Sequence, residues 1–173
     1  TGKSITAKAI HCELGNLKLI ESNGEMLNNV PELTSALLSA DDNTTLFIDE
    51  CQSLGTKAQN LLLTAISEKK LYVPKNKSSR SCHSIPLANF TIIFASTHEY
   101  QVQDALRNRI RLYCRFDYYS LNDLADIVKQ RIVSLGWQCE SDIVIAEIAQ
   151  RAKQTRRLAL NRNLQMVYNV ASS

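Results

Sequence analysis

Apolar and polar positions follow two different patterns along the chain. Up to about residue 118, short apolar runs alternate with stretches in which apolar residues recur every three or four positions. This alternation predicts strands connected by helices, and therefore an α/β domain with a parallel sheet over 1–118. From about residue 119 the periodicity is helical throughout, which predicts a small all-helical lid domain over 119–173.

Four segments have the length and composition of strands. Thr44–Ile48 and Phe90–Ala95 are almost wholly apolar or β-branched, so we expect them to be buried. Leu17–Glu21 is followed by a turn-like Ser-Asn-Gly, and a fourth strand is expected at Leu112–Phe116.

Two shorter runs predict a β-hairpin inserted into the α/β domain. Lys70–Val73 and Ser84–Leu87 flank a polar stretch, Lys75–Ser81, which gives a hairpin with a long loop. The expected helices are Ile5–Ile10, with Ile5, Ala9 and Cys12 on one side, a short helix that Pro31 opens, Lys57–Glu68, Leu121–Leu135, Ile143–Ala152 and Leu158–Val170.

The composition indicates a cytoplasmic protein without a membrane segment. Apolar residues make up 45% of the 173 residues, but no run approaches the roughly 20 that a membrane-spanning helix needs, and no signal-peptide pattern is present. The five cysteines are widely spaced and form no C-x-x-C pair. This spacing predicts reduced thiols in or near a core and argues against a zinc site or a disulfide framework.

Charge is unevenly distributed although the net charge is only +3. Glu13–Glu50 holds eight acids and one base, whereas Lys69–Arg80, Arg107–Arg115 and Arg151–Arg162 are basic. Such polarity favours an approach of phosphate or nucleic acid from one side, although each basic run is equally compatible with an ordinary solvated surface.

The tetrapeptide Thr1-Gly2-Lys3-Ser4 precedes the first predicted helix. Gly-Lys-Ser in this position is the end of a P-loop, in which glycine lets backbone N–H groups approach phosphate. The lysine of such a loop contacts the β- and γ-phosphates, and the hydroxyl ligates Mg²⁺. A tripeptide alone is a common chance match.

A pair of carboxylates, Asp49-Glu50, ends the buried strand Thr44–Ile48. The carboxyl ends of strands are where α/β sheets bind ligands. Asp49 can therefore support Mg²⁺ while Glu50 polarises an attacking water. Acids at an ordinary strand end or helix cap are the alternative, which the P-loop remnant about 45 residues earlier makes less attractive.

Three further segments carry polar or basic groups in a consistent order. Ser96-Thr97 ends the second buried strand, where a hydroxyl can lie beside a γ-phosphate, or can simply form a turn. Leu106–Arg109 and Arg156-Arg157 offer cations, which are otherwise solvated charges. Their order after the P-loop and the carboxylate pair is more informative than any one of them.

The order of motifs resembles that of AAA+ ATPases over nearly the whole chain, and most of all the RuvB-type Holliday-junction branch-migration helicases. Leu46–Glu50 resembles the L-F-I-D-E strand of that family, its Walker B motif. Phe90–Thr97 resembles F-T-L-[IV]-G-A-T-T, Leu106–Ile110 resembles L-R-[DS]-R-F, and Thr155–Ala159 resembles T-P-R-I-A.

The resemblance implies specific roles. Glu50 would orient water, Thr97 would be the sensor-1 residue that reads the γ-phosphate, and Arg109 would be the arginine finger that acts on a neighbouring subunit's nucleotide. ATP contacts are implied for Thr1, Gly2, Lys3, Ser4, Asp49 and the sensor-2 arginine Arg157, and Mg²⁺ contacts for Ser4 and Asp49.

The implied function is that of an ATP-hydrolysing subunit of a homo-oligomeric ring, a hexamer, that drives branch migration of Holliday junctions in DNA recombination and repair. Residues 70–87 lie where the family has its pre-sensor-1 hairpin, which contacts the junction-binding partner RuvA. The basic tip Lys75–Arg80 makes direct DNA contact a competing role. The alternatives are another AAA+ replication ATPase, such as a clamp loader or a phage or plasmid enzyme, and an inactive AAA+ adaptor.

The sequence departs from the family pattern in two motifs. Gln154–Arg157 replaces G-T-P-R, and Ile110-Arg111 replaces phenylalanine-glycine, which affects how Arg157 and Arg109 are placed. The strand that precedes the P-loop in this class and the winged-helix domain at its far end are not in the sequence, so we expect a chain truncated at both ends. Alone, it is expected to bind nucleotide poorly and to hydrolyse it weakly or not at all.

Overall fold

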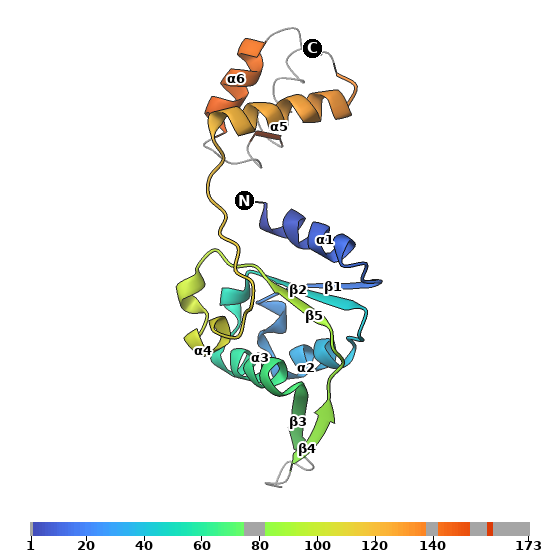
Figure 1. Ribbon diagram of the computed structural model, residues 1–173. Coiled ribbons are helices and arrows are strands. Elements are labelled where there is room, and N and C mark those ends of the chain that lie inside the picture. The colour runs from blue at the N-terminus through green and yellow to red at the C-terminus, as the bar shows by residue number, and fades with distance from the viewer. Residues whose placement is uncertain (1, 75–81, 138–141, 153–158, 161–173) are drawn as a thin grey trace. The chain divides into compact units, whose positions relative to one another are not determined.

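Strands and helices alternate in the N-terminal part of the chain, and helices alone follow (Figure 1). The computed structural model describes residues 2–74, 82–137, 142–152 and 159–160. They divide into two compact units. The first spans Lys3–Tyr113, and the second consists of the residues from Cys114 onward together with Gly2 at the start of the chain. In chain order the helices and strands are α1 (Lys3–Glu13), β1 (Lys18–Asn23), α2 (Val30–Leu38), β2 (Thr44–Asp49), α3 (Thr56–Glu68), β3 (Lys70–Pro74), β4 (Cys82–Pro86), β5 (Thr91–Phe94), α4 (Asp104–Arg107), α5 (Leu121–Ser134) and α6 (Asp142–Arg151).

The first unit is built on a three-stranded parallel sheet in the order β1-β2-β5. The central strand β2 is buried along its apolar length, as expected for a parallel strand covered by helices on both faces. Its register places Asp49 opposite Asn23 of β1, and Ile48 opposite Phe94 of β5. The carboxyl ends of the three strands therefore meet at one edge of the sheet.

Helices cover both faces of this sheet (Figure 1). Alternate side chains of a strand point to opposite faces. Leu46 and Ile48 accordingly pack into the larger core with α2 and α3, whereas Phe47 packs with Ala7 of α1 and with Ala95. This sandwich of helix, sheet and helix confirms the α/β prediction and fixes β2 in place from both sides.

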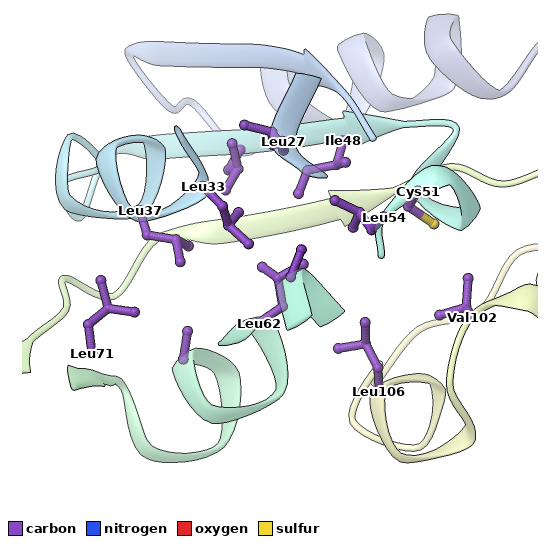
Figure 2. Packing of buried hydrophobic residues seen from close by; sticks show 13 residues of the cluster. Leu27, Leu33, Leu37, Ile48, Cys51, Leu54, Leu62, Leu71, Val102 and Leu106 are labelled. Atoms are coloured by element: carbon purple, nitrogen blue, oxygen red, sulfur yellow. The ribbon is translucent and has the colours of Figure 1, made fainter. Parts of the chain in front are cut away.

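Figure 2 shows the larger core, where fully buried leucines fill the space between the sheet and its helices. Leu33 and Leu37 of α2 and Leu62 of α3 have no exposed surface. Each such side chain contributes about 1.5–3 kcal/mol on burial. Leu54, five residues after the end of β2, lies in the same cluster, so the segment that follows Asp49 is anchored in the larger core.

The strands β3 and β4 form a separate antiparallel pair. Leu71 of β3 lies opposite Ile85 and is buried in the larger core, which ties the base of the pair to the sandwich. The basic tip that the sequence places at Lys75–Arg80 lies outside the described residues.

The second unit has an irregular segment, 114–120, followed by helices in the residues that are described. Leu124 and Val128 of α5 pack against Ile148 and Ala149 of α6, in the periodic pattern that predicts the two helices. α5 ends at Ser134, and Gly136, two residues further on, has a φ of +69°, the left-handed conformation common after a helix. Most of the third predicted helix, Leu158–Val170, lies outside the described residues.

The strand expected at Leu112–Phe116 is wrong. No strand of the described structure pairs with this segment, and Leu112 and Tyr113 are 74% and 62% exposed. Backbone N–H and C=O groups need partners, which a strand obtains from its neighbours. An apolar run therefore forms a strand only where a neighbouring strand accepts it.

The first helix is present, but another of its sides faces the sheet. Ala7 is buried, whereas Ile5 and Cys12 are exposed. The side toward the sheet also carries Ser4 and His11, which hydrogen-bond to residues of β2. Because these polar residues of α1 face the sheet, the spacing of its apolar residues predicts the wrong side of the helix as the buried one. Of the helices in the described residues, none is long and apolar enough to cross a membrane.

Candidate functional site

Three chain segments meet at the carboxyl edge of the parallel sheet. They are the first turn of α1 with Lys3 and Ser4, the end of β2 with Asp49 and Glu50, and the residues that follow β5. Hydrogen bonds between residues up to 93 positions apart connect the three segments. The predicted P-loop lysine and the carboxylate pair thus lie at the same site.

The Ser4 hydroxyl donates a hydrogen bond of 2.8 Å to Oδ2 of Asp49. The other oxygen of Asp49, Oδ1, accepts from the backbone N–H of Glu50 at 2.9 Å, which fixes the plane of the carboxylate. A hydroxyl and a carboxylate oxygen at this separation are hard ligands of the kind that Mg²⁺ takes. Mg²⁺ commonly binds one or two such protein groups together with phosphate and water, so Ser4 and Asp49 fit the metal.

Lys3 places a positive charge at the N-terminus of α1. Its Nζ donates to the backbone carbonyl of Ser96 at 2.8 Å, directly after β5. The first turn of α1 contains no acidic residue, so no side chain of the helix itself opposes the partial positive charge of its N-terminus. A helix N-terminus with an adjacent lysine is a phosphate-binding arrangement, and the triphosphate of a nucleotide fits it.

Glu50 has an unusual backbone conformation that directs its side chain toward the end of β5. Its φ is +47°, which is uncommon for a residue other than glycine. Its Oε2 accepts a hydrogen bond of 2.9 Å from the hydroxyl of Thr97. Hydrogen bonds from Gln52 and Thr97 and the nearby charge of Lys3 lower the pKa of Glu50. The carboxylate is therefore ionised at neutral pH and can accept a hydrogen bond from a water.

Gln52 connects the ends of two strands, and the motifs did not identify it. Its side-chain N–H donates to Oε2 of Glu50 and to the hydroxyl of Thr97, the latter at 3.0 Å. Its carbonyl oxygen accepts from the hydroxyl of Ser96 at 2.6 Å. An amide two positions after a carboxylate pair is the one signal in the sequence that suggests such a contact.

Gly24 allows the end of β1 to pass close to Glu50. Its backbone N–H donates to the carbonyl of Asp49 at 2.9 Å. A Cβ at this position would lie 2.4 Å from the carbonyl oxygen of Glu50, which no side chain can tolerate. The sequence indicates only a turn here, because the contact depends on the register of β1 and β2.

Cys51, between Glu50 and Gln52, is a structural residue. It is buried in the larger core, and burial raises the pKa of its thiol to about 11. The thiol is therefore protonated and unreactive at neutral pH. The expectation of thiols in or near a core holds for Cys51 but is wrong for Cys12, Cys82 and Cys114, which are exposed.

The remaining predicted site residues lie outside this network or outside the described residues. Arg109 is exposed in the turn after α4, where its N–H donates to the carbonyl of Leu106. Gly2 has a φ of +118°, which suits glycine. Thr1 and Arg157 lie outside the described residues.

A protein-family model described as "Holliday junction DNA helicase RuvB P-loop domain" matches residues 1–116. The "Holliday junction branch migration complex subunit RuvB" of Thermosipho melanesiensis is 30% identical over 161 residues, which cover 92% of this chain and 50% of that protein. The residues matched by the family model include each of the segments that meet at the sheet edge.

Solved structures of RuvB from Thermotoga maritima have the same fold. A mutant of that protein superposes with a TM-score of 0.86 at 24% identity, over 99% of this chain and 54% of the other. The structure titled as its Holliday junction branch migration motor gives 0.82 at 23% identity, over 99% and 53%. The chain thus spans about half the length of the relatives it matches. With the family model covering residues 1–116, the chain belongs to the RuvB P-loop domain family of Holliday junction DNA helicases.

Proposed function

We propose that the chain is the ATPase part of a ring-forming motor that drives branch migration of Holliday junctions in DNA recombination and repair. The observation that carries the proposal is the convergence of Lys3, Ser4, Asp49, Glu50 and Thr97 at one sheet edge. A site that combines a phosphate-binding lysine, two metal ligands and an oriented carboxylate is suited to hydrolysis of a nucleoside triphosphate.

Each of these side chains has a distinct task in the proposed mechanism. Lys3 binds the triphosphate, and Ser4 and Asp49 bind Mg²⁺. Bound ATP and Mg²⁺ supply the phosphoryl group and the metal charge that stabilises its transfer. Glu50 orients the attacking water and accepts its proton, while the Thr97 hydroxyl donates to the γ-phosphate.

Two arginines complete the proposed site. Arg157 contacts the nucleotide from the helical lid domain, residues 119–173, while the nucleotide-binding domain comprises residues 1–118. Arg109 acts on the nucleotide of a neighbouring subunit, and its exposed position supports that role. An arginine finger contributes about 10³–10⁵ in rate, so turnover needs a neighbouring subunit. The proposed assembly is a homo-oligomeric ring, a hexamer by resemblance to the family.

The β3–β4 pair is proposed to contact a RuvA-like junction-binding partner or DNA itself. The pair extends from the core at Leu71, and the sequence of its tip, Lys75–Arg80, is basic. Contacts to phosphate give a binding constant that falls steeply with salt, whereas docking on a protein partner through apolar side chains does not. A comparison of binding at low and high salt separates the two roles.

The test of the ATPase proposal is Glu50→Gln in the full-length protein. Glutamine keeps the size of the side chain but cannot accept the proton of water, so kcat is expected to fall by about 10²–10⁴ with ATP binding retained. Glu25→Gln, an exposed residue outside the network, is the matched control and should leave kcat unchanged. Near-normal turnover of Glu50→Gln would remove Glu50 from this role.

Substrate specificity tests the branch-migration part of the proposal. Four-way junction DNA with its junction-binding partner should stimulate ATP hydrolysis more than a linear duplex of equal length. Equal stimulation by both would favour another AAA+ replication ATPase. Absence of hydrolysis by the intact ring would favour an inactive adaptor.

A further inference from the structure

We propose that Gln52 is a positioning residue that fixes the Glu50 carboxylate for water activation and keeps it fixed when Thr97 turns to the nucleotide. This inference rests on the proposed ATPase function. It assigns a task in that reaction to a side chain that contacts Glu50, Ser96 and Thr97 together.

Backbone hydrogen bonds hold the turn that contains Gln52, so the position from which its side chain extends is fixed. Gln52 lies in a single turn of 3₁₀ helix, Cys51–Ser53. The N–H of Cys51 donates to the carbonyl of Ala95 at 2.9 Å, and the N–H of Ser53 donates to the carbonyl of Glu50 at 2.9 Å. Cys51 is buried in the larger core. The turn is thus tied to β5 and to the end of β2.

The orientation of the Gln52 amide follows from the chemistry of its neighbours. An ionised carboxylate only accepts hydrogen bonds, so the amide must present its NH₂ group to Glu50 and Thr97. The amide oxygen then faces Ser96, whose hydroxyl donates to it. Ser96 in turn accepts from the N–H of His98 at 3.1 Å. Each polar group in this chain of contacts has a partner of the right kind.

Thr97 alone cannot hold Glu50 during the reaction. A hydroxyl has one proton, so Thr97 cannot donate to Glu50 and to a phosphate at the same time. Gln52 can donate to Glu50 both when Thr97 bonds to Glu50 and when Thr97 bonds to the phosphate. The carboxylate therefore keeps one fixed hydrogen bond while the sensor hydroxyl changes its acceptor.

The proposal predicts a selective loss of kcat when Gln52 loses its donor. Gln52→Met in the full-length protein keeps an unbranched side chain of similar length but removes both polar groups. Because misplacement of a reacting group by about 1 Å costs about 10² in rate, kcat should fall about 10–100-fold. The KM for ATP and the affinity for a fluorescent ATP analogue should stay within about twofold, since Gln52 forms no hydrogen bond with Lys3 or Ser4, which bind the triphosphate and Mg²⁺.

A double mutant separates positioning from a structural role. In a Glu50→Gln background, Gln52→Met should cause no further loss of the residual turnover, because its effect acts through the carboxylate. Gln101→Met, which changes an exposed glutamine outside the network, is the matched control and should keep kcat. If Gln52→Met impairs folding, Gln52→Leu makes the same test, because it also removes both polar groups from the side chain.

The outcomes distinguish this inference from the proposed function. A wild-type ring that hydrolyses no ATP would overturn the proposed function. A wild-type ring that hydrolyses ATP while Gln52→Met retains its kcat, or loses equal turnover in both backgrounds, would overturn the role of Gln52 alone.

Discussion

Gly24 and Glu50 show how a single missing side chain shapes the site. The chain leaving β1 passes so close to the end of β2 that a Cβ on Gly24 would lie 2.4 Å from the Glu50 carbonyl oxygen and 3.3 Å from Cα of Cys51. All of these neighbours are backbone atoms, which cannot rotate away. Glu50 has a left-handed backbone conformation, which sets the direction of its carboxylate. This backbone has room only because residue 24 is a glycine.

Gly24→Ala should both destabilise the protein and reduce turnover. Overpacking against rigid backbone costs about 1–3 kcal/mol in the free energy of unfolding, measurable by urea denaturation followed by circular dichroism. Displacement of the Glu50 backbone should also lower kcat. Gly15→Ala is the control: its φ is +68°, but a Cβ there meets nothing within 4 Å. It should cost about 1 kcal/mol through strain alone and leave kcat unchanged. An equal effect of the two substitutions on kcat would contradict the steric argument.

The sequence predicts the site residues that belong to local motifs and misses those that depend on register. Lys3 and Ser4 lie at the start of a helix, and Asp49 and Glu50 end an apolar run, so a short stretch of sequence identifies each pair. Gln52 and Gly24 gain their contacts only when strands far apart in the sequence align. No local pattern contains that information.

At the scale of elements, the hydrophobic pattern locates most strands and helices but not always their buried side. It gives β2, α3 and α5 nearly to the residue. It fails for α1, where polar residues that bind β2 occupy positions facing the sheet, and for 112–116, which no described strand pairs with. Both failures arise because a partner, and not the segment itself, determines the outcome.

The start of α5 provides a prediction at this scale. Ser120 and Asp123 form a capping box, in which the Ser120 hydroxyl accepts from the N–H of Asp123 at 3.1 Å. The Asp123 carboxylate accepts from the N–H of Ser120 at 3.2 Å. Ser120→Ala should therefore lower the free energy of opening of the first turn by about 1 kcal/mol, measured by hydrogen exchange of its amides. Ser134→Ala, near the end of α5, should leave these amides unaffected; equal exchange in both variants would show that the cap contributes nothing.

At the scale of the whole molecule, the proposed site requires two subunits. The network at the sheet edge supplies the phosphate, metal and water contacts, but Arg109 is exposed and does not belong to it. If Arg109 completes the site of a neighbour, its loss and the loss of Glu50 disable different sides of the same interface. The two defects then complement each other in a mixed ring, whereas two defects within one subunit do not.

Mixing full-length Glu50→Gln and Arg109→Ala subunits tests this arrangement. Rings of either variant alone should be nearly inactive, because every site lacks either the water-orienting carboxylate or the arginine worth about 10³–10⁵ in rate. In a one-to-one mixture, about a quarter of the interfaces join an intact Glu50 to an intact Arg109 on the neighbouring subunit, so ATPase activity should reappear on mixing. A subunit that carries both substitutions should restore nothing when mixed with either variant. If Arg109 instead acts within its own subunit, each variant remains defective in every ring, and the mixture stays as inactive as its components.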